Sequence, residues 1–216
     1  MTSDVIASLK TFKVVPIIVI DELVGAEGTF GALIRGGLPV AEITLRTPIA
    51  LSVLELSRKK FPELIAGAGT VLNAQQARDA ISAGALFLVS PGFSQEVLDT
   101  SREWKIPYFP GVATATEIQL LANQDLSLMK FFPSEQLGGL ATISALASAF
   151  VDIEFMPSGG VNESNYLEYL RHPKIPLIGG SWLAPRSAIH SKNFSEIEFK
   201  TRNVVEVTQS DLPDKE

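Results

Sequence analysis

Val14-Val15-Pro16-Ile17-Ile18-Val19-Ile20 is continuously apolar and rich in β-branched residues. A strand with this pattern is buried on both faces, which is typical of a parallel sheet covered by helices. The next segment, residues 23–34, has a helical pattern, and Gly36 with Gly37 is a stop signal for that helix. The stretch therefore predicts an α/β protein that begins with a buried strand and a helix.

The same strand–helix unit recurs along the chain. The expected strands begin near residues 14, 40, 64, 85, 106, 128, 153 and 175, spaced by 21 to 26 residues. Eight even units predict a closed (β/α)8 TIM barrel of compact size, in preference to an open doubly wound sheet with one dominant phosphate loop. Four helix starts are predicted from capping residues: Thr47, Asn73, Thr114 and Asn162.

The pattern predicts one domain and no linker. We expect the barrel to occupy residues 1–207, closed by a helix over 194–207, and the polar residues 208–216 to form a frayed tail. A chain of 216 residues is long enough to bury a sizeable core.

Composition excludes several classes of protein. Hydrophobic residues make up 46% and charged residues 19% of the chain, as in a globular enzyme and not in a disordered protein. A net charge of −6 without a long basic run argues against nucleic-acid binding. The absence of cysteine rules out disulfides and thiolate chemistry. With no signal-peptide pattern at its start and no apolar run near 20 residues, the chain is expected to be soluble and cytoplasmic.

Lys130 lies in an apolar, strand-like run, Ser127-Leu128-Met129-Lys130-Phe131-Phe132-Pro133. Alternation places Lys130 on the same face as Leu128 and Phe132. Such a lysine can belong to an edge strand or extend to solvent from a strand end. It can also be a nucleophile, because a desolvated lysine loses affinity for its proton and the neutral amine attacks carbonyl groups.

The second predicted strand contains three polar residues at alternate positions. In residues 40–46, alternation places Glu42, Thr44 and Arg46 on one face. Glu42 and Arg46 can form a buried structural ion pair. Alternatively, Arg46 binds a substrate carboxylate with two hydrogen bonds and Glu42 transfers protons.

Glycine-rich segments follow several predicted strands. The small side chains of Gly67-Ala68-Gly69-Thr70 leave room in the lumen, where Thr70 adds a hydroxyl at the rim, and Pro91 of Ser90-Pro91 can form an apolar wall beside Lys130. Tight turns explain both segments equally well. The last two strands end in Pro157-Ser158-Gly159-Gly160 and Gly179-Gly180-Ser181-Trp182. Because barrels commonly hold phosphate in the loops after strands seven and eight, this matched pair predicts a phosphate site. The two histidines, His172 and His190, fall in predicted surface segments, so neither a metal cluster nor a Ser–His–Asp triad is indicated.

These motifs, in this order from about Val14 to Pro185, resemble the 2-keto-3-deoxy-6-phosphogluconate / 4-hydroxy-2-oxoglutarate aldolase family of lysine-dependent barrels. The resemblance implies that Lys130 forms a Schiff base and that Glu42 is the general acid/base. It implies that Arg46 and Thr70 hold the pyruvyl carboxylate and that Pro91 and Phe132 line the pocket. The residues that it implies for phosphate are Ser158, Gly159, Gly160, Gly180 and Ser181. Ser158 stands where familiar members have threonine, and residues 134–140 differ from the usual loop.

The resemblance implies a class I lyase that cleaves 2-keto-3-deoxy-6-phosphogluconate to pyruvate and glyceraldehyde 3-phosphate in the Entner–Doudoroff pathway. It implies no metal or organic cofactor, a small phosphorylated 2-keto acid as the partner, and a homotrimer. Activity on 4-hydroxy-2-oxoglutarate or on the galactonate epimer stays open. So do two other classes, a phosphosugar epimerase or isomerase and a non-catalytic phosphometabolite-binding barrel.

Overall fold

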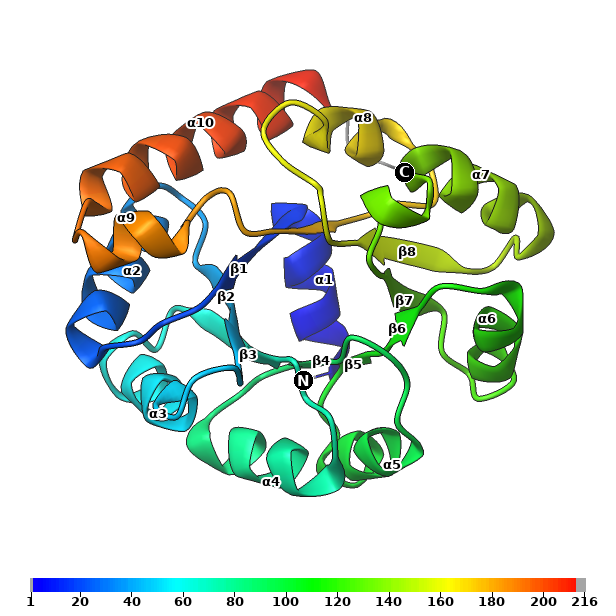
Figure 1. The fold of residues 1–216 in the computed structure, drawn as a ribbon, viewed down its shortest axis with the longest axis horizontal. Coiled ribbons are helices and arrows are strands. Elements are labelled where there is room, and N and C mark those ends of the chain that lie inside the picture. Colours follow the sequence, from blue (N-terminus) through cyan, green and yellow to red (C-terminus); the bar gives the residue numbers. More distant parts are fainter. Residues whose placement is uncertain (1, 213–216) are drawn as a thin grey trace.

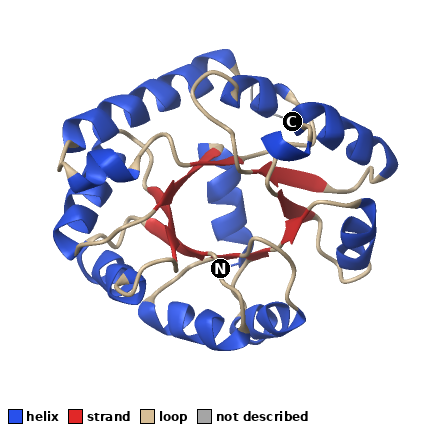
Figure 2. Cartoon of the chain, viewed as in Figure 1, coloured by secondary structure: helices blue, strands red, loops and turns tan. Residues whose placement is uncertain are grey.

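The computed structural model describes residues 2–212, which form one α/β domain with the strands inside and the helices outside (Figures 1 and 2). The strands are β1 (Val14–Ile18), β2 (Val40–Thr44), β3 (Ile65–Gly69), β4 (Leu88–Val89), β5 (Tyr108–Phe109), β6 (Gly111–Val112), β7 (Leu128–Phe131), β8 (Glu154–Pro157) and β9 (Ile178–Gly180). The α-helices are α1 (Thr2–Phe12), α2 (Leu23–Arg35), α3 (Ala50–Lys60), α4 (Ala74–Ala83), α5 (Gln95–Trp104), α6 (Ala115–Ala122), α7 (Gly139–Ala149), α8 (Tyr166–Arg171), α9 (Arg186–His190) and α10 (Phe194–Asp211), and a 3₁₀ turn, η1 (Glu135–Leu137), precedes α7.

All paired strands are parallel and follow one another around the barrel. One sheet has the order β5-β4-β3-β2-β1-β9 and the other the order β6-β7-β8. Pro110, which has no N–H to donate, separates β5, which falls in the strand predicted to begin near residue 106, from β6. On the other side, the Phe155 N–H of β8 donates to the Lys174 carbonyl, 2.8 Å away, just before β9. The predicted eight-unit, single-domain barrel is confirmed, with its fifth strand in two pieces.

Alternation along the strands decides which residues face the lumen. Ala41 and Ile43 of β2 join the buried cluster formed with helices α2 to α5, whereas Val40 belongs to a cluster that contains Phe87 and Phe109. Glu42 is also buried, at 1% exposure, on the same face as Val40. A carboxylate is therefore held inside the barrel by a strand that is buried along its whole length.

Helix α1 covers the barrel at the end where the strands begin. In Figure 1 it crosses the area that the strands enclose. Leu9 is buried in the cluster that contains Val40 and Phe87, and Lys10 forms an ion pair with Glu154, the first residue of β8, at 2.5 Å. This helix closes the N-terminal face, so side chains at the other ends of the strands are the ones accessible to a ligand.

Two of the four predicted N-caps are confirmed. Asn73 accepts a hydrogen bond from the Gln76 N–H, and Thr114 forms a full capping box with Glu117. The prediction for Thr47 was wrong because its hydroxyl donates instead to the Ile20 carbonyl, at 2.7 Å, and α3 begins at Ala50.

The predicted cap at Asn162 was also wrong. Its side-chain oxygen accepts from the Ser164 N–H within a turn, at 2.9 Å, and α8 begins only at Tyr166. The turn uses the side chain that was expected to cap the helix.

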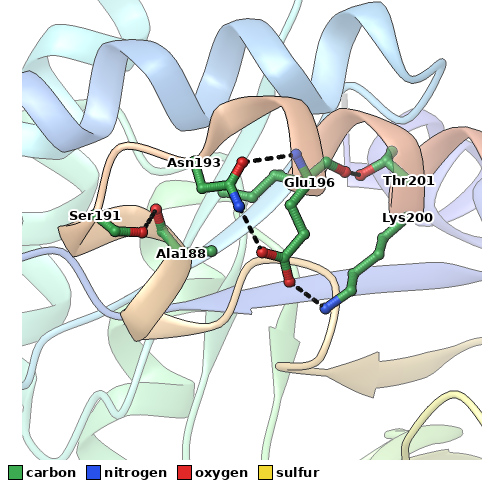
Figure 3. A network of polar contacts seen from close by, with 7 residues as sticks. Ala188, Ser191, Asn193, Glu196, Lys200 and Thr201 are labelled. Carbon is green, nitrogen blue, oxygen red and sulfur yellow. Dashed lines mark hydrogen bonds and ion pairs between the residues drawn. The ribbon is translucent and has the colours of Figure 1, made fainter.

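The closing helix is longer than expected. Asn193 caps the start of α10, because its side-chain oxygen accepts a hydrogen bond from the Glu196 N–H. The Glu196 carboxylate in turn accepts hydrogen bonds from Asn193 Nδ2 and Lys200 Nζ (Figure 3). The helix continues to Asp211, and Thr208 is buried with its hydroxyl donating to the Val204 carbonyl. Residues 208–211 therefore continue the helix instead of starting a polar tail, and residues 213–216 lie outside the described part.

Candidate active site

Lys130 and Glu42 meet inside the barrel, although they come from opposite strands. Four strand positions separate β2 from β7 in either direction around the barrel. Lys130 Nζ lies 3.7 Å from Glu42 Oε1, and the exposed fractions of the two side chains are 7% and 1%. The predicted pairing of amine and carboxylate is thus present, and its low exposure strengthens the electrostatic interaction.

Gly69 makes room for the Glu42 carboxylate. A Cβ on this glycine, at the end of β3, would clash with Glu42 Oε1. Glu42 Oε2 is buried, and no hydrogen-bond partner is found for it within residues 2–212. An unpartnered carboxylate oxygen in a polar lumen can receive a water molecule or a substrate hydroxyl.

Phe132 lies beside the lysine. Its ring centroid is 5.1 Å from Lys130 Nζ, within the range of a cation–π contact. The structure thus places the ring beside the amine, where the sequence predicts an apolar wall.

The other predicted residues of the pyruvyl end follow the C-terminal ends of neighbouring strands. Arg46 is exposed in the turn after β2, two residues beyond the end of that strand, and within residues 2–212 its guanidinium has neither a hydrogen bond nor an ion pair. Thr70 directly follows β3 with a φ of 60°, and Pro91 lies just after β4. Thr44 does not join this group, since its hydroxyl donates to the Ile18 carbonyl at 3.0 Å.

The loop after β8 lies against the segment that follows Lys130. The Ser134 N–H donates to the Ser158 carbonyl at 2.8 Å, and the Glu135 N–H donates to the Gly159 carbonyl at 3.0 Å. Gly159 and Gly160 have φ values of 88° and 87°, which glycine adopts readily. These two glycines leave the loop without side chains at successive positions, so that backbone N–H groups can approach an anion closely.

The end of β9 lies beside this loop. A Cβ on Gly179 would lie 3.2 Å from Ser158 Oγ, so the two glycine-rich segments are in contact. Gly180 is buried and Ser181 is exposed at the rim. A Cβ on Gly180 would clash with the indole of Trp182, whose ring therefore covers this glycine. The segments predicted to bind phosphate are brought together.

The KDPG and KHG aldolase family model matches residues 5–199. The chain belongs to this aldolase family. The Escherichia coli K12 KHG/KDPG aldolase is 40% identical to it over 198 residues, which are 92% of this chain and 93% of the relative.

Two solved aldolase structures have the same fold. A KDPG aldolase from Legionella pneumophila, with pyruvate captured as a covalent carbinolamine, is 39% identical with a TM-score of 0.89, covering 94% of this chain and 98% of that one. The 2-keto-3-deoxy-6-phosphogluconate aldolase of Zymomonas mobilis ZM4, with 3-phosphoglycerate, is 34% identical with a TM-score of 0.89, covering 95% and 96%. The predicted family is thereby confirmed.

Three features of the site were not predicted from the sequence. These are the space that Gly69 leaves for Glu42, the indole of Trp182 over Gly180, and the packing of Glu135 on the loop after β8. The first and the third are contacts between different segments, and the second is a contact between residues two positions apart in one segment. Neither alternation nor spacing in the sequence predicts such contacts. The small side chains of residues 67–69 predicted space in the lumen but not which side chain occupies it. Within residues 2–212, no group of three or more His, Cys, Asp or Glu side chains could hold a metal ion.

Proposed function

We propose that this protein is a class I aldolase that cleaves 2-keto-3-deoxy-6-phosphogluconate to pyruvate and glyceraldehyde 3-phosphate. The observation that supports the assignment of residues is the buried pair of Lys130 and Glu42, 3.7 Å apart at the centre of the barrel. An amine that forms an imine and a nearby group that transfers protons are the two parts this reaction needs.

In the proposed mechanism, the neutral amine of Lys130 attacks C2 of the substrate to give a carbinolamine. Loss of water forms an iminium, which is the electron sink for breaking the C3–C4 bond. Glu42, acting through a water on its unpartnered Oε2, takes the proton of the C4 hydroxyl, so that C4 leaves as the aldehyde. The resulting enamine is protonated at C3, and hydrolysis releases pyruvate and the amine.

The two ends of the substrate are assigned to different parts of the rim. Arg46 and Thr70 bind the carboxylate next to C2, with the planar guanidinium giving two hydrogen bonds. Pro91 and Phe132 form the walls beside the imine. The phosphate is held by a group of backbone N–H donors and hydroxyls from both glycine-rich segments: Ser158, Gly159, Gly160, Gly180 and Ser181.

A second substrate, 4-hydroxy-2-oxoglutarate, is favoured by one observation. The Escherichia coli relative, 40% identical, is a KHG/KDPG aldolase. We propose that this chain cleaves that compound as well, to pyruvate and glyoxylate, since the bond broken is the same. An epimerase, an isomerase or a non-catalytic barrel would not require a buried lysine opposite a carboxylate.

We further propose that the protein acts in the cytoplasm, in the Entner–Doudoroff pathway, as a homotrimer. Within residues 2–212, no helix combines the length and the apolar character needed to cross a membrane. Sedimentation of the purified protein would test the trimer directly.

The substrate assignment is tested by measuring kcat/KM side by side on three compounds. These are 2-keto-3-deoxy-6-phosphogluconate, its galactonate epimer and 4-hydroxy-2-oxoglutarate. We expect the gluconate to give the highest value. A preference for the galactonate epimer would overturn the assignment while leaving the lysine chemistry intact.

A further inference from the structure

Three side chains behind the loop after β8, two of them buried, form a polar cluster that the proposed mechanism does not use. Ser134 Oγ lies 3.0 Å from the hydroxyl of Tyr169, which also donates a short hydrogen bond to the Glu135 carboxylate. Ser134 is fully buried and Tyr169, on α8, is 2% exposed, whereas Glu135 is exposed. We refer to Ser134, Glu135 and Tyr169 as the Tyr169 brace. Buried polar groups that satisfy one another in this way fix the conformation of the segments that carry them.

The brace reaches the loop after β8 through Glu135. The Cβ and Cγ of Glu135 occupy the space that a side chain at position 160 would need. The Glu135 backbone is fixed to the same loop by its hydrogen bond to the Gly159 carbonyl, at 3.0 Å. Glu135 is therefore held from two sides, by Tyr169 at its carboxylate and by the loop at its backbone, with Gly160 packed against its stem.

The same cluster is joined to the segment of the lysine. Ser134 and Glu135 follow Lys130 by four and five residues, and the Ser134 N–H donates to the Ser158 carbonyl at 2.8 Å. Tyr169 thus contacts the segment that links β7, which contains Lys130, to the glycine loop after β8.

We propose that Tyr169 is a positioning residue for the phosphate end of the substrate, acting through Glu135 on Gly160. The inference rests on the proposed function in placing the phosphate at this loop. The hydroxyl of Tyr169 has two tasks. It holds the Glu135 stem against Gly160, so that the backbone N–H groups keep their direction. It also donates to the Glu135 carboxylate, which fixes the position of that charge relative to the loop.

Electrostatics supports this arrangement. Burial, and then the hydrogen bond to Glu135, raise the pKa of Tyr169 to about 12, so the phenol remains a donor at neutral pH. The hydrogen bond that positions the Glu135 carboxylate is therefore retained at neutral pH.

The test compares five variants of the full chain: four single variants and the double variant Tyr169→Phe/Glu135→Ala. In Tyr169→Phe the donor is lost, and in Glu135→Ala both the stem and the acceptor are lost. Glu135→Gln keeps the stem and an acceptor. Tyr166→Phe is the matched control, because it removes a hydroxyl from the same helix, three residues away. Two properties are measured: the Kd of inorganic phosphate, by phosphorus NMR titration, and kcat/KM on the gluconate with and without its phosphate.

We expect Tyr169→Phe and Glu135→Ala each to raise the Kd of phosphate roughly tenfold and to lower the preference for the phosphorylated substrate by a similar factor. The double variant should be no worse than the worse single variant, because the residues act as a unit. Glu135→Gln and Tyr166→Phe should stay within about threefold of the unaltered protein. Trapping of pyruvate on Lys130 should not change in any of them.

Two results would overturn the proposal. One is an unaltered phosphate Kd in Tyr169→Phe. The other is an equal loss on both forms of the substrate together with weaker pyruvate trapping, which is what general damage to the barrel would cause. Since the phosphate titration needs no turnover, it decides the role of Tyr169 even if the proposed aldol cleavage fails.

Discussion

Lys130 and Glu42 extend toward each other from opposite sides of the barrel, and Nζ and Oε1 lie 3.7 Å apart. This distance lies within ion-pair range, and the carboxylate is near enough to accept the proton that the amine must lose before it attacks a carbonyl. Glu42 Oε2 remains available for a water, since no partner for it occurs within residues 2–212. One carboxylate can therefore serve both the formation of the imine and the cleavage that follows.

Glu42→Gln separates these two tasks. The amide keeps the volume of the side chain but cannot take up a proton, so we expect kcat for cleavage to fall about 10²- to 10⁴-fold. Borohydride trapping of pyruvate on Lys130 should fall much less, because formation of the imine can use water as the base. Comparison of the two rates is the measurement. Equal losses in both would assign Glu42 a structural role.

Gly69→Ala tests whether the space beside Glu42 matters. The added methyl group would overlap Glu42 Oε1, so the carboxylate must move away from Lys130. We expect a loss in kcat of about 10²-fold, with the far-UV circular dichroism spectrum unchanged. Gly92→Ala is the matched control, because a Cβ there meets no atom within 4 Å. The account would be contradicted if both variants retained full activity.

Much of this arrangement can be predicted from the sequence because it depends on local patterns. Apolar runs at regular spacing predict the strands, and alternation within residues 40–44 places Glu42 in the lumen. The pattern fails where a residue has an alternative partner. Thr47 was predicted to begin a helix, but its hydroxyl donates to the carbonyl of Ile20, two residues beyond β1. Arg46 lies beyond the strand in a turn, where alternation no longer determines its direction.

Other parts of the site depend on contacts that no local pattern encodes. The close approach of the Glu42 carboxylate to Gly69 arises from the register of two adjacent strands, in which Thr44 pairs with Gly69. The hydrogen bond from Tyr169 to Glu135 joins residues 34 positions apart. The family resemblance supplied roles for the site residues, but it did not supply these supporting contacts. The assigned roles themselves stay predictions until the variants are measured.

Arg46→Lys tests the carboxylate end of the substrate. Lysine keeps the charge but cannot form the paired hydrogen bonds of a guanidinium. We expect KM for the phosphorylated substrate to rise about tenfold and the concentration of pyruvate needed for half-maximal trapping to rise similarly. Arg186→Lys, whose arginine pairs with Asp21 at 2.6 Å, is the control for a general effect of the exchange. Identical values for both variants would remove Arg46 from the site.

The Tyr169 phenol gives a prediction about alkaline stability. Because its pKa is raised to about 12 from the ordinary value of 10.0, the folded state holds the proton more tightly than the unfolded chain. Its contribution to the free energy of unfolding is therefore complete below pH 10 and is lost as the pH rises toward about 12. Urea denaturation of the unaltered protein and of Tyr169→Phe should show a difference that shrinks across this window. A difference that stays constant would contradict the raised pKa.

The central claim is that Lys130 forms the imine, and the most direct test is reduction with borohydride in the presence of pyruvate, followed by peptide mass spectrometry. We predict a covalent three-carbon adduct on the peptide that contains Lys130, and its disappearance in Lys130→Met. An unmodified protein, or adducts confined to surface lysines, would contradict the account.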